Sequence, residues 1–191
     1  MHRHIFWQPW DEPGFEHLMI NGTAAEIVAD GLVIRDFDAG PFRAHYVIRC
    51  DHAFRARSVI VAVRHTTDKQ LVLHADGHGR WTDANGDKLL DLDGCIDVDL
   101  SATSFTNTLP IRRLDLAVGE HRDLHVVYIA VPELHVSVEP QRYTCLDRRP
   151  DGATYPYQSL DGDFTADLPV DHDGLVVDYP GLFHRVHRHR S

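Results

Sequence analysis

Hydrophobic and polar positions alternate along most of the chain with a period of two residues. Between positions 42 and 50, one face carries Phe42, Ala44, Tyr46, Ile48 and Cys50, and the opposite face carries Arg43, His45 and Arg49. This alternation predicts a strand with one buried face. Further strands are expected at residues 58–65, 71–75, 95–101, 111–118, 124–131, 134–138, 142–146, 164–168 and 174–179.

Turn signals separate these strands, and two of them predict hairpins. Asn85-Gly86 is typical of a tight turn whose two central residues take positive φ, so residues 71–92 are expected to form a three-stranded meander. Asp30-Gly31 predicts a second hairpin, between residues 23–30 and 32–36. Residues 147–162 lack a clear period and are expected to be a surface loop.

No segment has the pattern of a convincing amphipathic helix. Short strands with turn signals every ~8–12 residues predict an all-β fold, an antiparallel barrel, half-barrel or sandwich. The 191 residues suit a single domain, because no repeat or linker divides them. Its core is expected at about 7–186, with a short His/Arg-rich tail at 187–191.

The charge balance argues against two classes of partner. Asp and Glu number 29 against 19 Lys and Arg, a formal net charge of −10. Nucleic acid and anionic membrane surfaces both favour basic proteins, so neither is an expected partner. No run approaches the ~20 apolar residues of a membrane span. Three scattered cysteines and no signal-peptide pattern favour a reducing, cytoplasmic location.

Two carboxylates stand out between positions 95 and 101. In a strand, Asp97 and Asp99 would share a face about 7 Å apart, opposite Ile96, Val98 and Leu100. Such a pair suits acid/base catalysis or a divalent cation. The solvated face of an ordinary strand is the simpler interpretation, and the residue spacing alone favours it.

Two neighbouring arginines are the next candidates. If residues 111–116 are extended, Arg112 and Arg113 point to opposite faces, and one of them lies on an apolar side where it needs a partner. Asp97, Asp99 and Asn107 are the candidate partners. The arginine then belongs either to a structural ion pair or to a polar anchor at the mouth of a cavity.

Polar aromatic residues suggest an amphipathic ligand. Gln141, Tyr143 and Cys145 share one face, and Tyr128 shares a face with Val126 on the preceding strand. A phenol has an apolar body and a polar tip, which suits such a ligand, although ordinary sheet packing explains these residues as well. The hydroxyl-rich loop at 103–110 offers further but unspecific contacts.

Metal and cofactor sites are not expected. The chain has 15 histidines, but His184, His187 and His189 are spaced for no single helix or strand face, and zinc motifs are absent. The sequence also lacks G-x-S-x-G, G-x-G-x-x-G and the P-loop motif. Cys95 alternates with its neighbours as a small buried hydrophobic residue does.

Four segments resemble a known bacterial family. They are residues 94–100 (GCIDVDL), 105–114 (FTNTLPIRRL), Val131-Pro132 followed by Gln141-x-Tyr143-Thr144, and 178–183 (DYPGLF). Their order and spacing are similar to those of the family named "putative glycolipid-binding", over about residues 7–186. The matching polar positions are Asp97, Asp99, Asn107, Arg112, Arg113, Gln141, Tyr143, Asp178 and Tyr179.

The resemblance implies an antiparallel sheet curled into an open or split barrel, similar to bacterial lipoprotein carriers that hold acyl chains on a concave face. It implies no catalytic residues. Three functional hypotheses follow. The first is non-enzymatic binding of a lipid or glycolipid, with the motif residues and Tyr128 at the head group. The others are a hydrolase that uses Asp97 and Asp99, and a structural or protein-interaction domain without a ligand.

Overall fold

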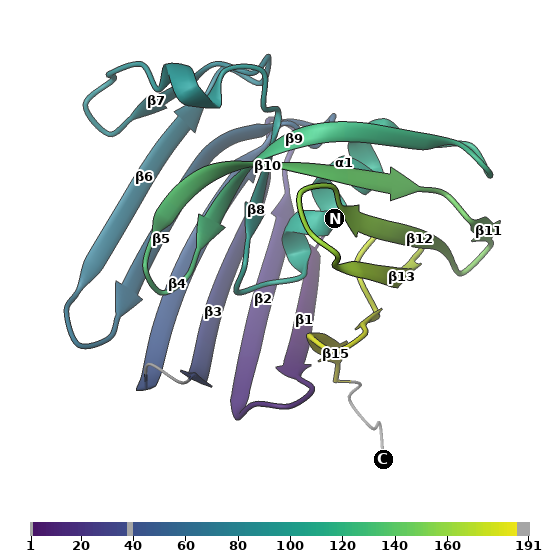
Figure 1. Cartoon of the computed structure of the whole chain (residues 1–191), viewed down its shortest axis with the longest axis horizontal. Coiled ribbons are helices and arrows are strands. Elements are labelled where there is room, and N and C mark those ends of the chain that lie inside the picture. Colours follow the sequence, from purple (N-terminus) through teal and green to yellow (C-terminus); the bar gives the residue numbers. More distant parts are fainter. Residues whose placement is uncertain (1, 38–39, 187–191) are drawn as a thin grey trace.

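Two β-sheets make up the computed structural model, which describes residues 2–37 and 40–186 (Figure 1). The nine-stranded sheet A has the order β14-β15-β1-β2-β3-β4-β5-β6-β7, and its pairs are antiparallel. Its strands are β1 (His2–Pro9), β2 (Gly14–Gly22), β3 (Ile27–Phe37), β4 (Gly40–Cys50), β5 (Ala56–Arg64), β6 (Lys69–Ala75), β7 (Trp81–Asp83), β14 (Asp178–Tyr179) and β15 (Phe183–Arg185).

Sheet B is smaller, and it contains one parallel pair. Its order is β11-β12-β10-β9-β8, with β13 on the other edge of β12, and β8 runs parallel to β9. Its strands are β8 (Asp97–Leu100), β9 (His121–Ala130), β10 (His135–Thr144), β11 (Asp147–Arg149), β12 (Gly152–Ser159) and β13 (Thr165–Asp171). Three short helices precede β9: η1 (Leu90–Leu92), η2 (Phe105–Asn107) and α1 (Thr108–Leu114).

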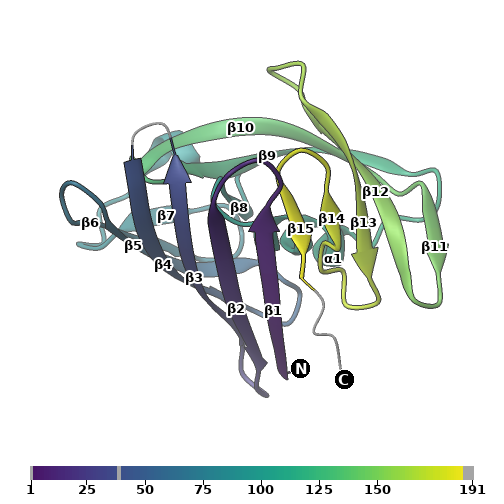
Figure 2. The same cartoon turned by 90° about the horizontal axis from the view of Figure 1, so that it is seen from below.

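The hydrophobic core lies between the two sheets. Sheet A fans out as a curved half-barrel, and the long strands β9 and β10 arch across its open side (Figures 1 and 2). Strand β8 and helix α1 lie in the space between them, and their apolar side chains join the core cluster. The predicted all-β fold, an antiparallel sheet curled into an open barrel, is confirmed, with 58% of residues in strands and 7% in helices.

The hairpin predicted at Asp30-Gly31 is wrong, because β3 runs unbroken through both residues. Gly31 pairs with Tyr46 on β4, and a Cβ at Gly31 would lie 2.1 Å from the Tyr46 ring. Glycine in a strand often marks such a close approach rather than a turn. Gly31 therefore makes room for the fully buried Tyr46 ring.

The strand predicted at 111–118 is also wrong, because residues 108–114 form α1. A seven-residue helix is too short to display a helical period, and Pro110 in its first turn interrupts no backbone hydrogen bond. The helix buries Leu109 and Ile111 and ends at Asp115, whose φ is +45°. The sequence analysis, which found no helix pattern, therefore missed the element that carries both motif arginines, Arg112 and Arg113.

The surface loop predicted at 147–162 is replaced by the hairpin of β11 and β12. Ala153, Tyr155 and Tyr157 point alternately into the core, a strand pattern interrupted in the sequence by Pro156. The predicted strands at 134–138 and 142–146 are parts of one strand, β10. In the 71–92 meander, β6 and β7 pair as expected, but the third strand is reduced to a single bridge between Thr82 and Lys88.

The predicted His/Arg-rich tail at 187–191, including His187 and His189, lies outside the described residues. Among the residues that the structure does describe, no helix has the length and hydrophobicity needed to cross a membrane.

Candidate ligand-binding site

Strand β8 places Asp99 beside Tyr128, its partner across the parallel pair with β9. The Asp99 Oδ1 atom accepts a hydrogen bond from Thr106 Oγ1 at 2.9 Å, and Oδ2 accepts one from Gln141 Nε2 at 2.7 Å. Burial raises the pKa of the Asp99 carboxyl, and these two hydrogen bonds oppose that rise. Since a carboxylate has about four acceptor positions, two remain for other donors.

A chain of hydrogen bonds extends from Asp99 through buried polar side chains. Gln141 binds Asp99 through its amide nitrogen and accepts a bond from the Tyr143 hydroxyl at 3.4 Å. The same hydroxyl accepts a bond from Asn107 Nδ2 at 2.9 Å. Burial raises the pKa of Tyr143 well above its usual value, so the phenol stays neutral. The structure therefore brings together four of the predicted site residues in one network.

A cavity of about 330 Å³ opens beside this network. Its polar lining includes Asp99, Asn107 and Arg35. Much of the rest is aromatic or apolar: Tyr128, Tyr157, Phe164, Tyr179, Phe183, Leu100 and Leu182. Aromatic rings that surround a few convergent polar groups are typical of sites for small amphipathic molecules.

Two charged residues near this cavity were not predicted from the sequence. The Arg35 guanidinium lies 4.3 Å from the centroid of the Phe183 ring in the cavity wall. Glu16 Oε1 accepts hydrogen bonds from Thr103, which also lines the cavity, at 2.6 Å, and from Tyr46 at 2.5 Å. Arg35 and Glu16 both occupy buried positions in the alternating pattern of their strands. A charged residue at a position where the alternation expects a hydrophobic one is the sequence signal that could have identified them.

The Glu16 carboxyl is held away from water. Its side chain is almost fully buried, and burial raises its pKa from 4.5 to about 7. Its second oxygen, Oε2, is buried with no hydrogen-bond partner among the described residues. A neutral carboxylic acid is the favoured form in such surroundings.

The other carboxylate of the predicted pair has a different environment. Asp97 is completely buried and binds Arg113 through both carboxylate oxygens, with Arg113 Nε at 3.0 Å from Oδ1. The solvated strand face considered for this pair is therefore wrong, because β8 is covered on both sides. Of the two alternatives left open for the arginines, Arg113 forms the structural ion pair.

The remaining predicted residues lie elsewhere or at the edge of the cavity. Arg112 lines a separate cavity under α1, which shares no lining residue with the one beside Asp99. Asp178 accepts a hydrogen bond from the exposed Trp10 indole at 3.1 Å, next to Tyr179 in the cavity wall. Within residues 2–37 and 40–186, no group of three His, Cys, Asp or Glu side chains is placed to hold a metal ion.

Comparison with known proteins identifies the family. Residues 4–185 match the family model described as "Putative glycolipid-binding". The chain belongs to this family. The chain is also similar to the crystal structure of a DUF1089 family protein from Pseudomonas aeruginosa, with a TM-score of 0.83 and 37% identity over 93% of this chain and 95% of that one. No curated protein matches the chain.

Proposed function

We propose that this family member binds an amphipathic small molecule, a lipid or glycolipid, without catalysing a reaction. The observation that carries the proposal is the cavity beside Asp99, where aromatic walls adjoin a carboxylate with free acceptor positions. The walls suit an apolar tail or the face of a sugar ring. The oxygens of Asp99 suit the hydroxyl groups of a polar head group, and the family description supports this class of ligand.

The hydrolase alternative requires two carboxylates that act on one substrate. Asp97 is fully buried and bound to Arg113, and it is not among the residues that line the cavity with Asp99. Asp97 has no exposed surface, so neither a substrate nor an attacking water can reach its oxygens. The geometry therefore favours binding over hydrolysis by this pair.

We also propose that the protein acts in a reducing compartment such as the cytoplasm. Cys50, Cys95 and Cys145 are all buried as free thiols. Burial raises the pKa of Cys50 and of Cys95, which keeps these two thiols protonated and unreactive.

A matched pair of variants tests the assignment of Asp99. Octyl glucoside, which has a sugar head and an alkyl tail, is titrated below its micelle concentration by isothermal calorimetry. Asp99→Asn is expected to weaken binding about 10-fold or more, because hydrogen bonds to a charged acceptor contribute roughly 1.5–3 kcal/mol. Asp123→Asn makes the same change at an exposed carboxylate paired with Arg142, and its affinity is expected to equal that of the unmodified protein.

Glucose and octanol, titrated separately, show whether both halves of the ligand contribute. If octyl glucoside bound Asp99→Asn as tightly as the unmodified protein, Asp99 would not contact the head group. If neither octyl glucoside nor octanol bound, the proposed ligand class would be wrong.

A further inference from the structure

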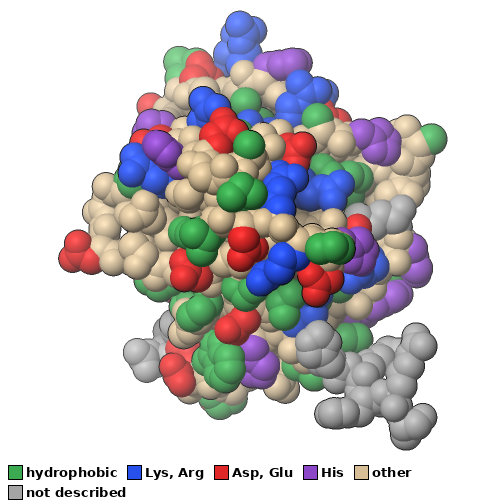
Figure 3. Space-filling view, turned by 90° about the vertical axis from the view of Figure 1, so that its right-hand side faces the viewer, with side chains coloured by type: hydrophobic (Ala, Val, Ile, Leu, Met, Phe, Trp, Pro, Cys, Tyr) green, Lys and Arg blue, Asp and Glu red, His purple; other side chains and the backbone are tan. Residues whose placement is uncertain are grey.

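A second cavity, of about 400 Å³, lies between α1, the β11–β12 hairpin and the loop after β13. Four of its lining residues are basic: Arg112, Arg148, Arg149 and His172. On this side of the molecule basic and acidic side chains lie close together (Figure 3). Whether the cavity attracts anions therefore depends on which of these charges are already neutralised.

Both acidic residues of the cavity are engaged by other groups. Asp115 binds Arg148 at 2.6 Å. Asp171 Oδ1 accepts the backbone N–H groups of Asp173 and Leu175, and its Oδ2 accepts bonds from Arg3 and Arg185. With four donors on one carboxylate, Asp171 has no acceptor position left for a further cation.

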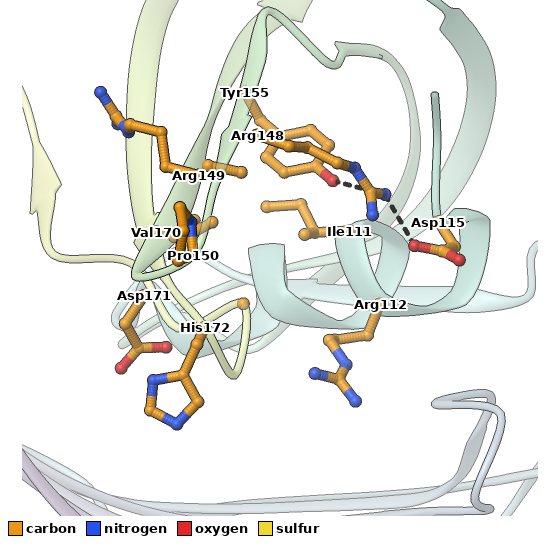
Figure 4. Close-up of a pocket in the computed structure, with 13 residues that line it drawn as sticks. Ile111, Arg112, Asp115, Arg148, Arg149, Pro150, Tyr155, Val170, Asp171 and His172 are labelled. Carbon is orange, nitrogen blue, oxygen red and sulfur yellow. Dashed lines mark hydrogen bonds and ion pairs between the residues drawn. The ribbon is translucent and has the colours of Figure 1, made fainter. Parts of the chain in front are cut away.

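Of the other basic residues, Arg149 lies 3.6 Å from Asp147, and His172 lies 3.4 Å from Asp173, which is outside the cavity lining. Arg112 is the basic residue of the cavity that no acid engages. Within residues 2–37 and 40–186, its guanidinium forms no hydrogen bond or ion pair, although it lies on a cavity wall. Figure 4 shows its guanidinium pointing away from α1 on the same side as the His172 ring, while Arg148 is turned toward Asp115. Surface arginines without a partner are common and are usually mobile. Arg112 is a candidate ligand contact only if its side chain is held by packing.

Two contacts hold the Arg112 side chain in place. Its guanidinium carbon lies 4.9 Å from the centroid of the Phe54 ring. Its aliphatic stem packs against Gly174, where a Cβ would lie 2.9 Å from Arg112 Cδ. Gly174 has a φ of +76°, a conformation that glycine adopts without strain. These two contacts orient the exposed Arg112 side chain, and orienting its donors before a ligand binds reduces the entropy lost on binding.

We propose that this cavity is a binding site for a phosphate group, with Arg112 as the principal contact and His172 beside it. The planar guanidinium can donate two parallel hydrogen bonds to two oxygens of one phosphate, a match that favours arginine at such sites. The volume admits a small phosphate monoester or the head group of an anionic lipid. The site shares no lining residue with the cavity beside Asp99, so it does not depend on the ligand proposed there.

The test uses the full chain at low ionic strength, with inorganic phosphate and glycerol phosphate titrated by calorimetry and followed by phosphorus NMR. Arg112→Gln is expected to weaken phosphate binding about 10-fold or more, because charge-assisted hydrogen bonds are lost. Arg112→Lys keeps the charge but not the planar fork, and is expected to give an intermediate affinity. Arg122→Gln removes the same charge at an exposed position and is expected to bind as the unmodified protein does.

Flotation with phosphatidylcholine vesicles, with and without phosphatidic acid, distinguishes the two sources of the phosphate group. Arg112-dependent binding to the phosphatidic acid vesicles alone would assign a lipid head group, and Arg112-dependent binding of glycerol phosphate a soluble ligand. Thermal melts of each variant confirm that it is folded. Equal phosphate affinity in Arg112→Gln and Arg122→Gln, or no binding to any of these probes at millimolar phosphate, would overturn the proposal.

Discussion

Replacing Asp97 with alanine is expected to lower the free energy of unfolding by about 3–5 kcal/mol. Asp97 has no exposed surface, and Arg113, which binds both of its oxygens, is only 17% exposed. Removing the carboxylate leaves the guanidinium buried without its counter-charge. Urea unfolding followed by tryptophan fluorescence measures this loss.

Two further variants separate this effect from a general loss of charge. Asp123→Ala breaks an exposed pair with Arg142 and is expected to cost about 0–1 kcal/mol, because water solvates both groups. The double variant Asp97→Leu with Arg113→Met removes both buried charges, and it is expected to recover much of the stability lost in Asp97→Ala. A cost below about 1 kcal/mol for Asp97→Ala would contradict the structural role of the ion pair.

The Glu16→Gln variant is expected to gain stability relative to the unmodified protein as the pH rises from 5 to 8. In the folded protein, burial raises the pKa of Glu16 to about 7, against 4.5 for the ordinary group. The folded state then binds more protons than the unfolded state between these values, so the stability contributed by Glu16 is full below pH 4.5 and is lost as the pH rises through 7.

Glutamine cannot ionise, so the Glu16→Gln variant does not lose this stability as the pH rises. The difference in unfolding free energy between the variant and the unmodified protein is expected to change by about 2.5 kcal/mol between pH 5 and pH 8. Urea titrations at several pH values measure it. Glu120→Gln removes a surface carboxylate and reports the contribution of net charge alone. Parallel stability curves for Glu16→Gln and the unmodified protein would show that Glu16 ionises as an ordinary carboxyl does.

The strands were predictable where one face is buried and the other is in water. The alternation at β4 and at β5 gave both strands within two residues, because their burial alternates with the same period. The hairpin at Asp30-Gly31 was predicted wrongly because glycine is a common turn residue. Here the glycine is needed for the close approach of the Tyr46 ring on the facing strand, which the sequence does not show. Helix α1 was missed because its seven residues are too few to establish a helical period.

The candidate site was predictable only in part, because the motif residues have different roles in the folded chain. Asp99, Asn107, Gln141 and Tyr143 meet in one network, of which the strand pattern placed only Gln141 and Tyr143 on a common face. Asp97 differs from Asp99 only in its neighbours, Arg113 in one case and Thr106 with Gln141 in the other. These contacts come from segments far apart in the sequence. Arg35 was missed for the same reason, since its partner ring, Phe183, is separated from it by most of the chain.

Native mass spectrometry of freshly purified, tag-free protein tests the central claim most directly. The account predicts a reproducible adduct that organic solvent extracts as a lipid or glycolipid. It also predicts that Leu182→Trp loses this adduct while remaining folded. Leu182 lines the cavity beside Asp99 and is 38% exposed, so a larger indole ring there can take up cavity volume without entering the core. A ligand-free mass that persists after incubation with a lipid extract, or an adduct retained in Leu182→Trp, would contradict ligand binding in this cavity.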